Sequence, residues 1–392
     1  MASAGVADMA NPLHGHAHGS RGSMTNDISD IHHYTTGPSS VETQRHRRGK
    51  TAIMTRVLPA AHDAQLRRSH ERTVTMEYRR LGRAGVRVSV IGLGTNRFGT
   101  AQLPHTEVSN ILDAALDMGI NFIDSSDTYV RGRCEETLGQ ALKGRWHRFV
   151  VATKGGLPMG EGPNDRGASR YHIVQALEAS LCRLRSDHVD VYYMHRWDAA
   201  TPLEETLRAL DDLIRLGKIL YIGASAYVAW QLAQANLLAE LRGWAPLVVL
   251  QSEYNMFLRQ VEHEILPYCQ AAGVGFVPYA PLAGGFLTGK YRRGAPPPAG
   301  SRGESSPNVQ RYMTATYYDA LEALTAWAAA RSRGMNELAQ AWLMAQPQVC
   351  SVITGATCLE HVLHNVQAAS WALTPAEADE VNALLPQSSA HA

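Results

Sequence analysis

The sequence has no long hydrophobic run, no paired cysteines and almost no net charge. No apolar stretch approaches the roughly 18 residues that a membrane-spanning helix needs, which predicts a soluble, cytoplasmic protein without a membrane partner. The five cysteines are scattered and show no CxxC pair or metal-like Cys/His spacing, so reduced thiols, mostly buried, are expected. The net charge of +1 gives no reason to expect nucleic acid as a partner.

The first 75 residues also lack aromatic side chains, with Tyr34 as the exception. They hold eight of the 17 histidines, and nine Lys/Arg against six Asp/Glu. Such a segment has too little apolar surface to offset the entropy lost on ordering. We therefore predict a disordered tail over residues 1–75 and a folded domain over 76–392. The HGHAH stretch at 14–18 could hold a metal, but a solvated histidine cluster is commoner, and no metal site is expected.

From Met76 onward, short β-rich runs alternate with helix-sized segments. The eight runs are VIGLGT (90–95), NFIDSS (121–126), FVVATKG (149–155), VDVYYMH (189–195), ILYIGAS (219–225), VVLQSEY (248–254), GFVPYAP (275–281) and CSVITGA (350–356). The pattern predicts an α/β fold, a (β/α)8 TIM barrel with a long loop and an extra C-terminal helix. A Rossmann domain is the main rival, but the turn GLGTNRFG at 92–99 has Arg97 where GxGxxG needs its third glycine.

Two predicted helices have explicit start signals. Thr201-Pro202-Leu203-Glu204 and Thr374-Pro375-Ala376-Glu377 each read as a capping box with proline at the first helical position. After the first, an apolar face is predicted that ends at Gly217; its residues are Leu203, Leu207, Leu210, Leu213 and Ile214.

Polar side chains stand where the predicted strands end. Asp124, Lys154 and His195 end the second, third and fourth strands, and Tyr129 follows the second. In a barrel these ends converge on one face, where active sites lie. The spacing therefore predicts an acid, an ammonium, an imidazole and a phenol around one pocket.

This combination suits acid catalysis on a carbonyl group. A phenol titrates near pH 10, but a neighbouring Lys⁺ lowers its pKa, and a carboxylate holds that Lys in place. The imidazole can orient the carbonyl or assist proton transfer. None of the four is a reductant, so hydride would come from a cofactor. Each residue alone has an ordinary structural explanation, but four compatible types at successive strand ends favour catalysis.

With these motifs in view, the chain resembles the aldo-keto reductases over about residues 76–386. The similar motifs are YRRLGRAGVRVSVIGLGT, FIDSSDTY, VATKG, MHRWD, QSEYN, PYAPLAGGFLTGKY and ITGATCLEHVLHN. The likeness is strongest to the branch that includes potassium-channel β-subunits and bacterial oxidoreductases. It implies that Tyr129 is the general acid, supported by Asp124, Lys154 and His195.

The resemblance also implies NADP(H) extended across the top of the barrel, with NADH not excluded. Thr95 and Asn96 would lie beside the nicotinamide, Ser225 and Gln251 would bind its carboxamide, and Tyr279 would stack on it. The expected pyrophosphate contacts are Pro281, Leu282, Ala283, Gly285, Lys290 and Arg302. The expected adenosine contacts are Gly355, Thr357, His361, His364 and Asn365.

Some positions depart from the family pattern. His361 and His364 stand where Arg or Gln and then Glu are common, and a histidine is only partly charged near pH 7, which weakens the preference for a 2′-phosphate. Ala226 removes one expected cofactor hydrogen bond. Val130 and Cys134 are expected to border the substrate pocket.

Three functions are compatible with these residues. The first is an NADP(H)-dependent reductase of an aldehyde or ketone, and the second is a nucleotide-binding regulatory or redox-sensing subunit with little turnover. A third, an isomerase or aldolase using Lys154 as a Schiff-base nucleophile, would leave the cofactor motifs unexplained. The substrate is expected to be a small carbonyl compound or alcohol, while its identity and the oligomeric state stay open. Candidate pocket residues are the aromatics Trp197, Tyr227, Trp230, Phe286 and Tyr312 and the arginines Arg166, Arg170 and Arg196. A core or surface position is equally compatible with each aromatic, and solvated loop arginines are the commoner case.

Overall fold

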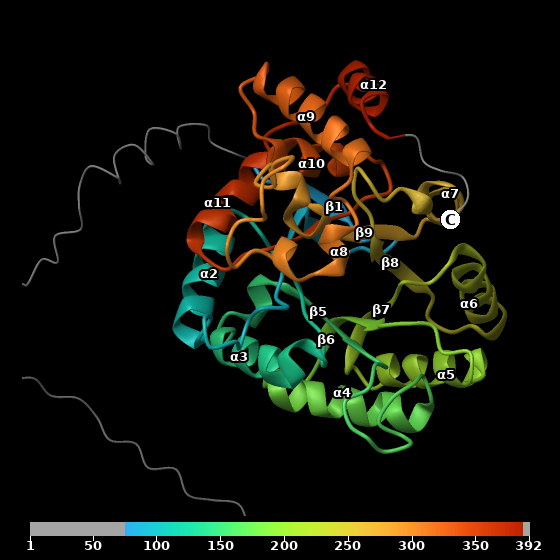
Figure 1. Ribbon diagram of the computed structural model, residues 1–392. Coiled ribbons are helices and arrows are strands. Elements are labelled where there is room, and N and C mark those ends of the chain that lie inside the picture. Colours follow the sequence, from blue (N-terminus) through green and yellow to red (C-terminus); the bar gives the residue numbers. More distant parts are fainter. Residues whose placement is uncertain (1–74, 387–392) are drawn as a thin grey trace, which may run out of the picture. The chain divides into compact units, whose positions relative to one another are not determined.

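The computed structural model describes residues 75–386, and eight parallel strands form its centre. In hydrogen-bonding order the sheet runs β10-β3-β4-β5-β6-β7-β8-β9. The strands are β3 (Ile91–Gly94), β4 (Phe122–Asp124), β5 (Val150–Gly155), β6 (Val189–Met194), β7 (Ile219–Ser225), β8 (Leu247–Glu253), β9 (Gly275–Tyr279) and β10 (Val352–Gly355). The two outer strands meet where Phe276 of β9 pairs in parallel with Val349, just before β10. The predicted (β/α)8 barrel is confirmed, and each strand overlaps its predicted run (Figure 1).

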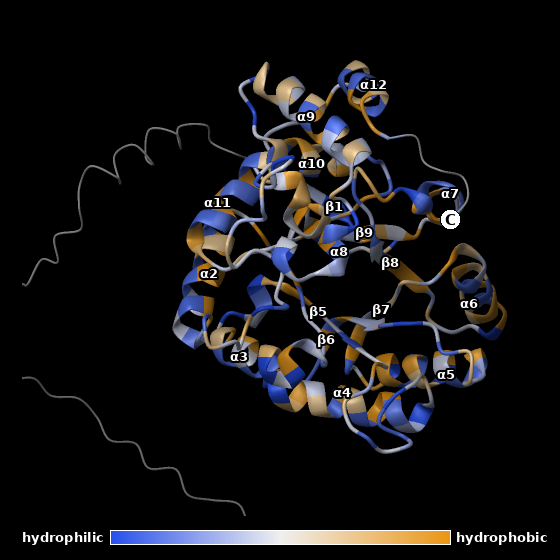
Figure 2. Cartoon of the chain, in the orientation of Figure 1, coloured by the Kyte–Doolittle hydropathy of each residue, from blue (hydrophilic) through white to orange (hydrophobic). Residues whose placement is uncertain are grey.

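Helices follow the strands and surround the barrel, and Figure 2 shows that they carry both hydrophobic and hydrophilic residues. They are α2 (His105–Asp117), α3 (Arg133–Ala141), α4 (Arg170–Leu184), α5 (Leu203–Arg215), α6 (Ala229–Arg242), α7 (Ile265–Ala272), α8 (Pro307–Gln310), α9 (Ala315–Ala329), α10 (Met335–Met344), α11 (Leu359–Ala368) and α12 (Pro375–Ala383). Short 3-10 segments are η1 (Tyr129–Gly132), η2 (Trp146–Arg148), η3 (Gln260–Glu262), η4 (Ala283–Thr288) and η5 (Arg302–Glu304). The predicted long loop after β9 and the extra C-terminal helix, α12, are both present.

An antiparallel hairpin of β1 (Tyr78–Arg80) and β2 (Arg87–Ser89) precedes the barrel and packs on its interior. Leu81 and Val88 are fully buried in one cluster with strand residues such as Phe122 and Val249. The turn must approach closely, because a Cβ on Gly82 would lie 2.3 Å from a backbone oxygen of β8. Because β2 leads into the amino end of β3, the hairpin covers that end and leaves the carboxyl ends of the strands for a site.

The start of α5 differs from the prediction. Pro202 occupies the N-cap position, and no side chain caps the helix. The hydroxyl of Thr201 instead donates to Asp198 Oδ2 at 2.7 Å. Thr201 lies one position too early to serve as the cap, so the predicted capping box there is wrong.

The other helix signals hold. Thr374 caps α12, because its hydroxyl accepts from the N–H of Glu377 at 3.2 Å and the Glu377 carboxylate accepts from the N–H of Thr374 at 2.9 Å. The apolar face of α5 packs on the core as predicted, and the chain leaves the helix at Gly217 with a positive φ of 72°. Its buried leucines are Leu207, Leu210 and Leu213.

Several further expectations can be compared with residues 75–386. No helix in this range is long and apolar enough to cross a membrane. All five cysteines are free; Cys134, Cys269 and Cys350 are buried as expected, whereas Cys182 and Cys358 are exposed. The tail over residues 1–75 and its HGHAH stretch lie outside the described residues, apart from Thr75.

Candidate functional site

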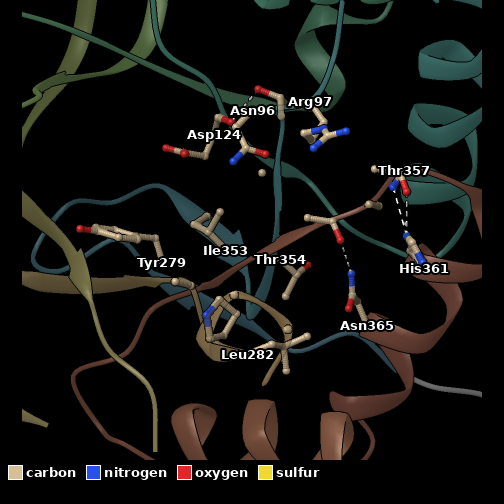
Figure 3. A pocket seen from close by; sticks show the side chains of 18 of the residues that line it. Asn96, Arg97, Asp124, Tyr279, Leu282, Ile353, Thr354, Thr357, His361 and Asn365 are labelled. Atoms are coloured by element: carbon tan, nitrogen blue, oxygen red, sulfur yellow. Dashed lines mark hydrogen bonds between the residues drawn. The ribbon is translucent and has the colours of Figure 1, made fainter. Parts of the chain in front are cut away.

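A cleft of about 1090 Å³ lies over the carboxyl ends of the strands. It is lined by the ends of β3, β4, β7, β8, β9 and β10, by the η4 turn and the long loop, and by the start of α11. Its volume is at the upper limit of about 300–1,000 Å³ for small-molecule sites. In Figure 3, Tyr279 lies toward one end of this pocket, and Thr357, His361 and Asn365 lie toward the other.

A buried ion pair forms the floor of the cleft. Lys154 is fully buried, and its Nζ donates to Asp124 Oδ2 at 2.7 Å, to the Ser125 carbonyl at 2.8 Å and to the Tyr129 hydroxyl oxygen at 3.2 Å. An ammonium has three hydrogens, and these three acceptors use all of them. Burial alone would lower the pKa of Lys154, but Asp124 and Tyr129 raise it overall, so the group stays charged.

Asp124 is held from two sides. Its Oδ2 accepts from Lys154, and its Oδ1 accepts from the Gln251 side-chain nitrogen at 2.8 Å. The Thr95 hydroxyl bonds the backbone oxygen of Asp124 at 2.8 Å. Gln251 was expected to meet a nicotinamide carboxamide; one of the two hydrogens on its side-chain nitrogen is already given to Asp124.

Tyr129 opens the η1 turn directly after the loop that follows β4. Val130 and Arg131 then take left-handed φ values of 50° and 54°, which non-glycine residues adopt rarely. Such strain persists where the surroundings fix the backbone, often at functional sites. Because the Tyr129 oxygen accepts from Lys154, its own hydrogen must point elsewhere, and its side chain lines the cleft.

The net effect of these surroundings on Tyr129 differs from the prediction. Burial raises the pKa of Tyr129, and this outweighs the opposing effect of the Lys154 ammonium. The expected lowering is therefore right for the lysine interaction but wrong as a net effect, because the sequence does not reveal how fully the phenol is desolvated. Tyr129 keeps its proton at neutral pH and can donate it.

His195 follows β6 and lies edge-on to Tyr129, with 6.2 Å between the ring centroids. Burial, helped by Lys154 and Arg196, lowers the pKa of His195 to about 3. The imidazole is therefore neutral near pH 7. Its Nδ1 lies 3.1 Å from Ser126 Oγ, so Nε2 is the ring nitrogen left to face the cleft.

Most residues expected to bind a cofactor line the cleft. They are Thr95, Asn96, Ser225, Gln251, Tyr279, Pro281, Leu282, Gly285, Lys290, Arg302, Gly355, Thr357, His361, His364 and Asn365. Ala283 is the exception, because its side chain is buried and its N–H is bonded to the Ala280 carbonyl. Gly284 lines the cleft instead.

Sequence reasoning missed several lining residues that the fold brings in. Arg97 had been considered only as a missing glycine, and Asn336 at the start of α10 gave no signal at all. The position of Arg97 directly after Asn96 could have suggested it. The others include Thr288, Ser301, Ile353 and Thr354.

The cleft is strongly cationic. Arg97, Arg196, Lys290 and Arg302 all line it, whereas Asp124 is the one carboxylate among its described lining residues and is already paired. A backbone without a side chain faces Lys290: Gly285 has a φ of 105°, and a Cβ there would lie 3.2 Å from Nζ. A long anion with several phosphate oxygens matches this charge.

His361 adds little charge to this cleft. Its Nδ1 accepts from the N–H of Thr357 at 3.3 Å and lies 3.1 Å from the Thr357 hydroxyl. Partial burial, with His364 and Lys290 nearby, lowers the pKa of His361. His361 is therefore neutral near pH 7 and makes a polar contact rather than an ionic one.

Four residues considered for the substrate pocket do not line the cleft. Cys134 does not border the cleft: it is fully buried, and its thiol lies 3.1 Å from Thr95 Oγ1. Phe286 and Tyr312 belong to the hydrophobic core. Arg170 begins α4 and forms an ion pair with Asp212.

The remaining aromatic candidates form a separate group. Trp197 packs edge-on against Tyr227 and Trp230, with ring centroids 5.2 Å and 5.6 Å apart. None of the three lines the described cleft, whereas Arg196, the neighbour of Trp197, does. Among residues 75–386 no cluster of three or more His, Cys, Asp or Glu side chains could hold a metal ion.

Comparison with known proteins agrees with this geometry. The profile of the Aldo/keto reductase family matches residues 90–386. The chain is 41% identical over 323 residues to a probable voltage-gated potassium channel subunit beta of Oryza sativa subsp. japonica, covering 79% of this chain and 97% of that one. It is 35% identical to the uncharacterized oxidoreductase YrpG of Bacillus subtilis (strain 168), covering 76% and 92%. It is 34% identical to the L-glyceraldehyde 3-phosphate reductase of Escherichia coli (strain K12), covering 76% and 89%.

Proposed function

The chain belongs to the aldo/keto reductase family of oxidoreductases, and from this premise we propose that it reduces an aldehyde or ketone to an alcohol with a nicotinamide dinucleotide, Tyr129 being the general acid. A reduced nicotinamide supplies hydride to the carbonyl carbon when it is bound. The protein supplies the proton and the orientation of the reacting groups.

The observation that carries the proposal is the bonding of Lys154. Its three hydrogens are used by Asp124, Ser125 and Tyr129, so the phenol oxygen is an acceptor and its hydrogen is free for a ligand in the cleft. As negative charge develops on a carbonyl oxygen, this hydrogen can move to it, and the adjacent ammonium stabilises the phenolate left behind. The same bonding argues against a Schiff-base lysine, because a charged, fully engaged amine is not a nucleophile.

His195 orients the carbonyl rather than acting as a cationic acid. The imidazole is neutral, since its pKa lies at about 3, and it lines the same cleft as Tyr129. A neutral imidazole can offer either an N–H or a lone pair through Nε2. Both roles position a ligand oxygen near the phenol.

The cofactor proposal rests on shape and charge. Four cationic side chains line the cleft, and Gly285 lets the backbone approach beside Lys290. We propose NADP(H) first, with Lys290, Arg97 and Arg302 as the phosphate-binding cations. Because His361 is neutral, a 2′-phosphate has one ionic partner fewer at the adenosine end, so NADH is the second candidate.

The second candidate function is a nucleotide-binding regulatory subunit, which the similarity to named channel β-subunits supports. The four residues proposed for acid catalysis are all present and lie together, and this favours the reductase. They are Asp124, Tyr129, Lys154 and His195. Arg196 lies beside His195 on the cleft wall, so phosphorylated and carboxylated aldehydes belong among the substrates tested.

The test is a fluorescence titration of the full chain with NADPH and NADH, followed by a panel of carbonyl compounds. Wild type is compared with Tyr129→Phe and with Tyr171→Phe, a matched change of an exposed tyrosine on α4. Losing a general acid lowers the rate by about 10²–10⁴-fold. We expect all three proteins to bind the cofactor. Only in Tyr129→Phe should the rate of cofactor oxidation by the carbonyl compound fall by that factor. Binding without turnover on any compound would support the regulatory subunit, and absence of nucleotide binding would overturn both functions.

A further inference from the structure

A buried polar chain lies behind His195, on the side away from the cleft. Ser126 and Asp127 are both fully buried on the loop after β4. Ser126 Oγ lies 3.2 Å from Asp127 Oδ1 and 3.1 Å from His195 Nδ1, and it accepts from the N–H of Thr128 at 3.3 Å. Neither residue contacts the Lys154 ion pair through its side chain, so the acid mechanism leaves this chain unused.

The number of hydrogens in the chain restricts its arrangement. Ser126 has one hydroxyl hydrogen, and Asp127, His195 Nδ1 and the Thr128 hydroxyl oxygen, 3.1 Å away, can each accept it. An ionised carboxylate forms the stronger, charge-assisted bond, so it takes this hydrogen. His195 must then donate from Nδ1 to Ser126, which leaves a bare lone pair on Nε2 in the cleft. If Asp127 carries a proton, it donates to Ser126, Ser126 donates to Nδ1, and the histidine hydrogen sits on Nε2.

We propose that Ser126 and Asp127 are positioning residues that set the tautomer of His195, so that protonation of Asp127 converts the cleft-facing Nε2 from an acceptor into a donor. The conversion balances as a relay. A solvent proton adds to Nε2, the Nδ1 hydrogen moves to Ser126 Oγ, and the former Ser126 hydrogen moves to Asp127. One proton is taken up in all, and it reaches the buried carboxyl through the histidine.

The surroundings of Asp127 place this conversion near neutral pH. Burial and the negative charge of Glu135 raise the pKa of Asp127 to about 7, opposed by Ser126, by the Thr128 backbone and by Arg183. The facing groups come from four elements: Glu135 on α3, held by Arg183 of α4 and by the Thr153 hydroxyl of β5, and Tyr192 on β6. Asp127 Oδ2 and the Tyr192 hydroxyl are buried without a hydrogen-bond partner among the described residues.

His195 itself stays neutral through this range. Lys154 and Arg196 are the charged groups that face it, with the Tyr129 ring at its edge, and both cations disfavour an imidazolium. A change observed at this ring near pH 7 is therefore a change of tautomer, not of charge.

The consequence for catalysis rests on the proposed reductase function. An Nε2–H donates to a carbonyl oxygen, which favours binding of the substrate to be reduced. A bare Nε2 accepts from an alcohol hydroxyl, which favours binding of the substrate to be oxidised. Acidic conditions would thus favour reduction beyond the effect of the proton consumed in the reaction.

The decisive experiment is ¹⁵N NMR of the imidazoles in the full-length protein, which distinguishes the two tautomers without any turnover. The His195 signals are assigned by their loss in His195→Gln. His172 is an internal reference, because its Nδ1 faces the Asn164 carbonyl at 2.9 Å and must keep its hydrogen. We expect the His195 hydrogen to move from Nδ1 to Nε2 as the pH falls from about 9 to about 5.5.

Two variants separate this role from a structural one. Ser126→Ala breaks the relay and Asp127→Asn removes the titrating carboxyl, so in either the His195 tautomer should no longer depend on pH. A tautomer that is constant in wild type, or that still shifts in Ser126→Ala, overturns the proposal. The NMR result does not require a carbonyl substrate. A failure of the tautomer proposal can therefore be distinguished from a failure of the proposed reductase function.

Kinetics provide a second readout once a substrate is known. Loss of one neutral hydrogen bond corresponds to about a threefold to tenfold change in affinity. We expect KM for the carbonyl to rise by this factor as Asp127 ionises, while KM for the alcohol falls. In Ser126→Ala both KM values should lose this dependence, whereas kcat changes little. A KM profile in this variant that matches wild type contradicts the proposal.

Discussion

Replacing Asp127 by asparagine tests how strongly the fold resists a charge at this position. Asp127 is fully buried, and its pKa is raised from 3.8 to about 7. Below the lower value both folded and unfolded chains carry the proton, so ionisation costs nothing. As the pH rises from about 4 to about 7, the unfolded chain ionises and the folded protein does not, and the free energy of unfolding falls.

The magnitude follows from the size of the shift. Each pKa unit corresponds to about 1.36 kcal/mol, so the shift from 3.8 to about 7 costs the folded state about 4 kcal/mol once Asp127 is ionised. About 3 kcal/mol of this accrues between pH 5 and pH 8. Asparagine keeps an oxygen for the Ser126 hydroxyl and cannot ionise. It also places an amide nitrogen where Oδ2 has no partner, which costs about 1–3 kcal/mol at every pH.

The assay is urea unfolding followed by tryptophan fluorescence at several pH values. The difference in unfolding free energy between Asp127→Asn and wild type should increase by about 3 kcal/mol from pH 5 to pH 8. Asp117→Asn, which removes an exposed carboxylate at the end of α2, should give a flat difference. A flat difference for Asp127→Asn as well would refute the reasoning, since Asp127 would then titrate like an ordinary surface aspartate.

Three further changes probe other parts of the site. Val130→Gly relieves a left-handed backbone conformation and should raise the free energy of unfolding by about 1 kcal/mol. Val228→Gly, at a φ of −82°, is the control and should not raise it. Equal shifts of the melting temperature in the two variants would contradict this. His361→Arg adds a permanent charge at the end of the cleft where we propose that the adenosine binds. It should favour NADPH over NADH by about fivefold or more, read from paired Kd values, and an unchanged ratio would mean that residue 361 does not contact the 2′-phosphate. Lys154→Met leaves a buried carboxylate unpaired and should lower the unfolding free energy by about 3–5 kcal/mol, so an unchanged denaturation midpoint would mean that the ion pair is not buried in solution.

Periodicity and strand-end chemistry were enough to predict the barrel. Apolar runs spaced by helix-sized segments specify parallel strands, and parallel strands in a closed ring bring their carboxyl ends together whatever the side chains are. Asp124, Lys154 and Tyr129 could therefore be predicted to meet without knowledge of any distance. The capping box at Thr374 was equally local and was equally predictable.

Two local predictions were wrong because they depended on which atoms the fold places around a side chain. Thr201 carries the same local signal as Thr374, yet Asp198 takes its hydroxyl. Cys134 was expected at the pocket from its position in the family pattern, in the loop before Glu135, but it lies in the first turn of α3, and its thiol is buried against Thr95. Proximity in the sequence does not determine where a side chain points, because each residue along an α-helix is rotated by about 100° from the one before it.

By itself the sequence determined which chemical groups assemble and on which face of the barrel they do so, because both follow from the order of strands and helices. Only the tertiary structure decided the protonation of those groups. Burial outweighs Lys154 and raises the pKa of Tyr129, and it leaves His195 neutral. The same packing brings Ser126 against His195, 69 residues away in the chain. Desolvation and hydrogen bonding act through space, so their balance exists only once the barrel has closed around these side chains.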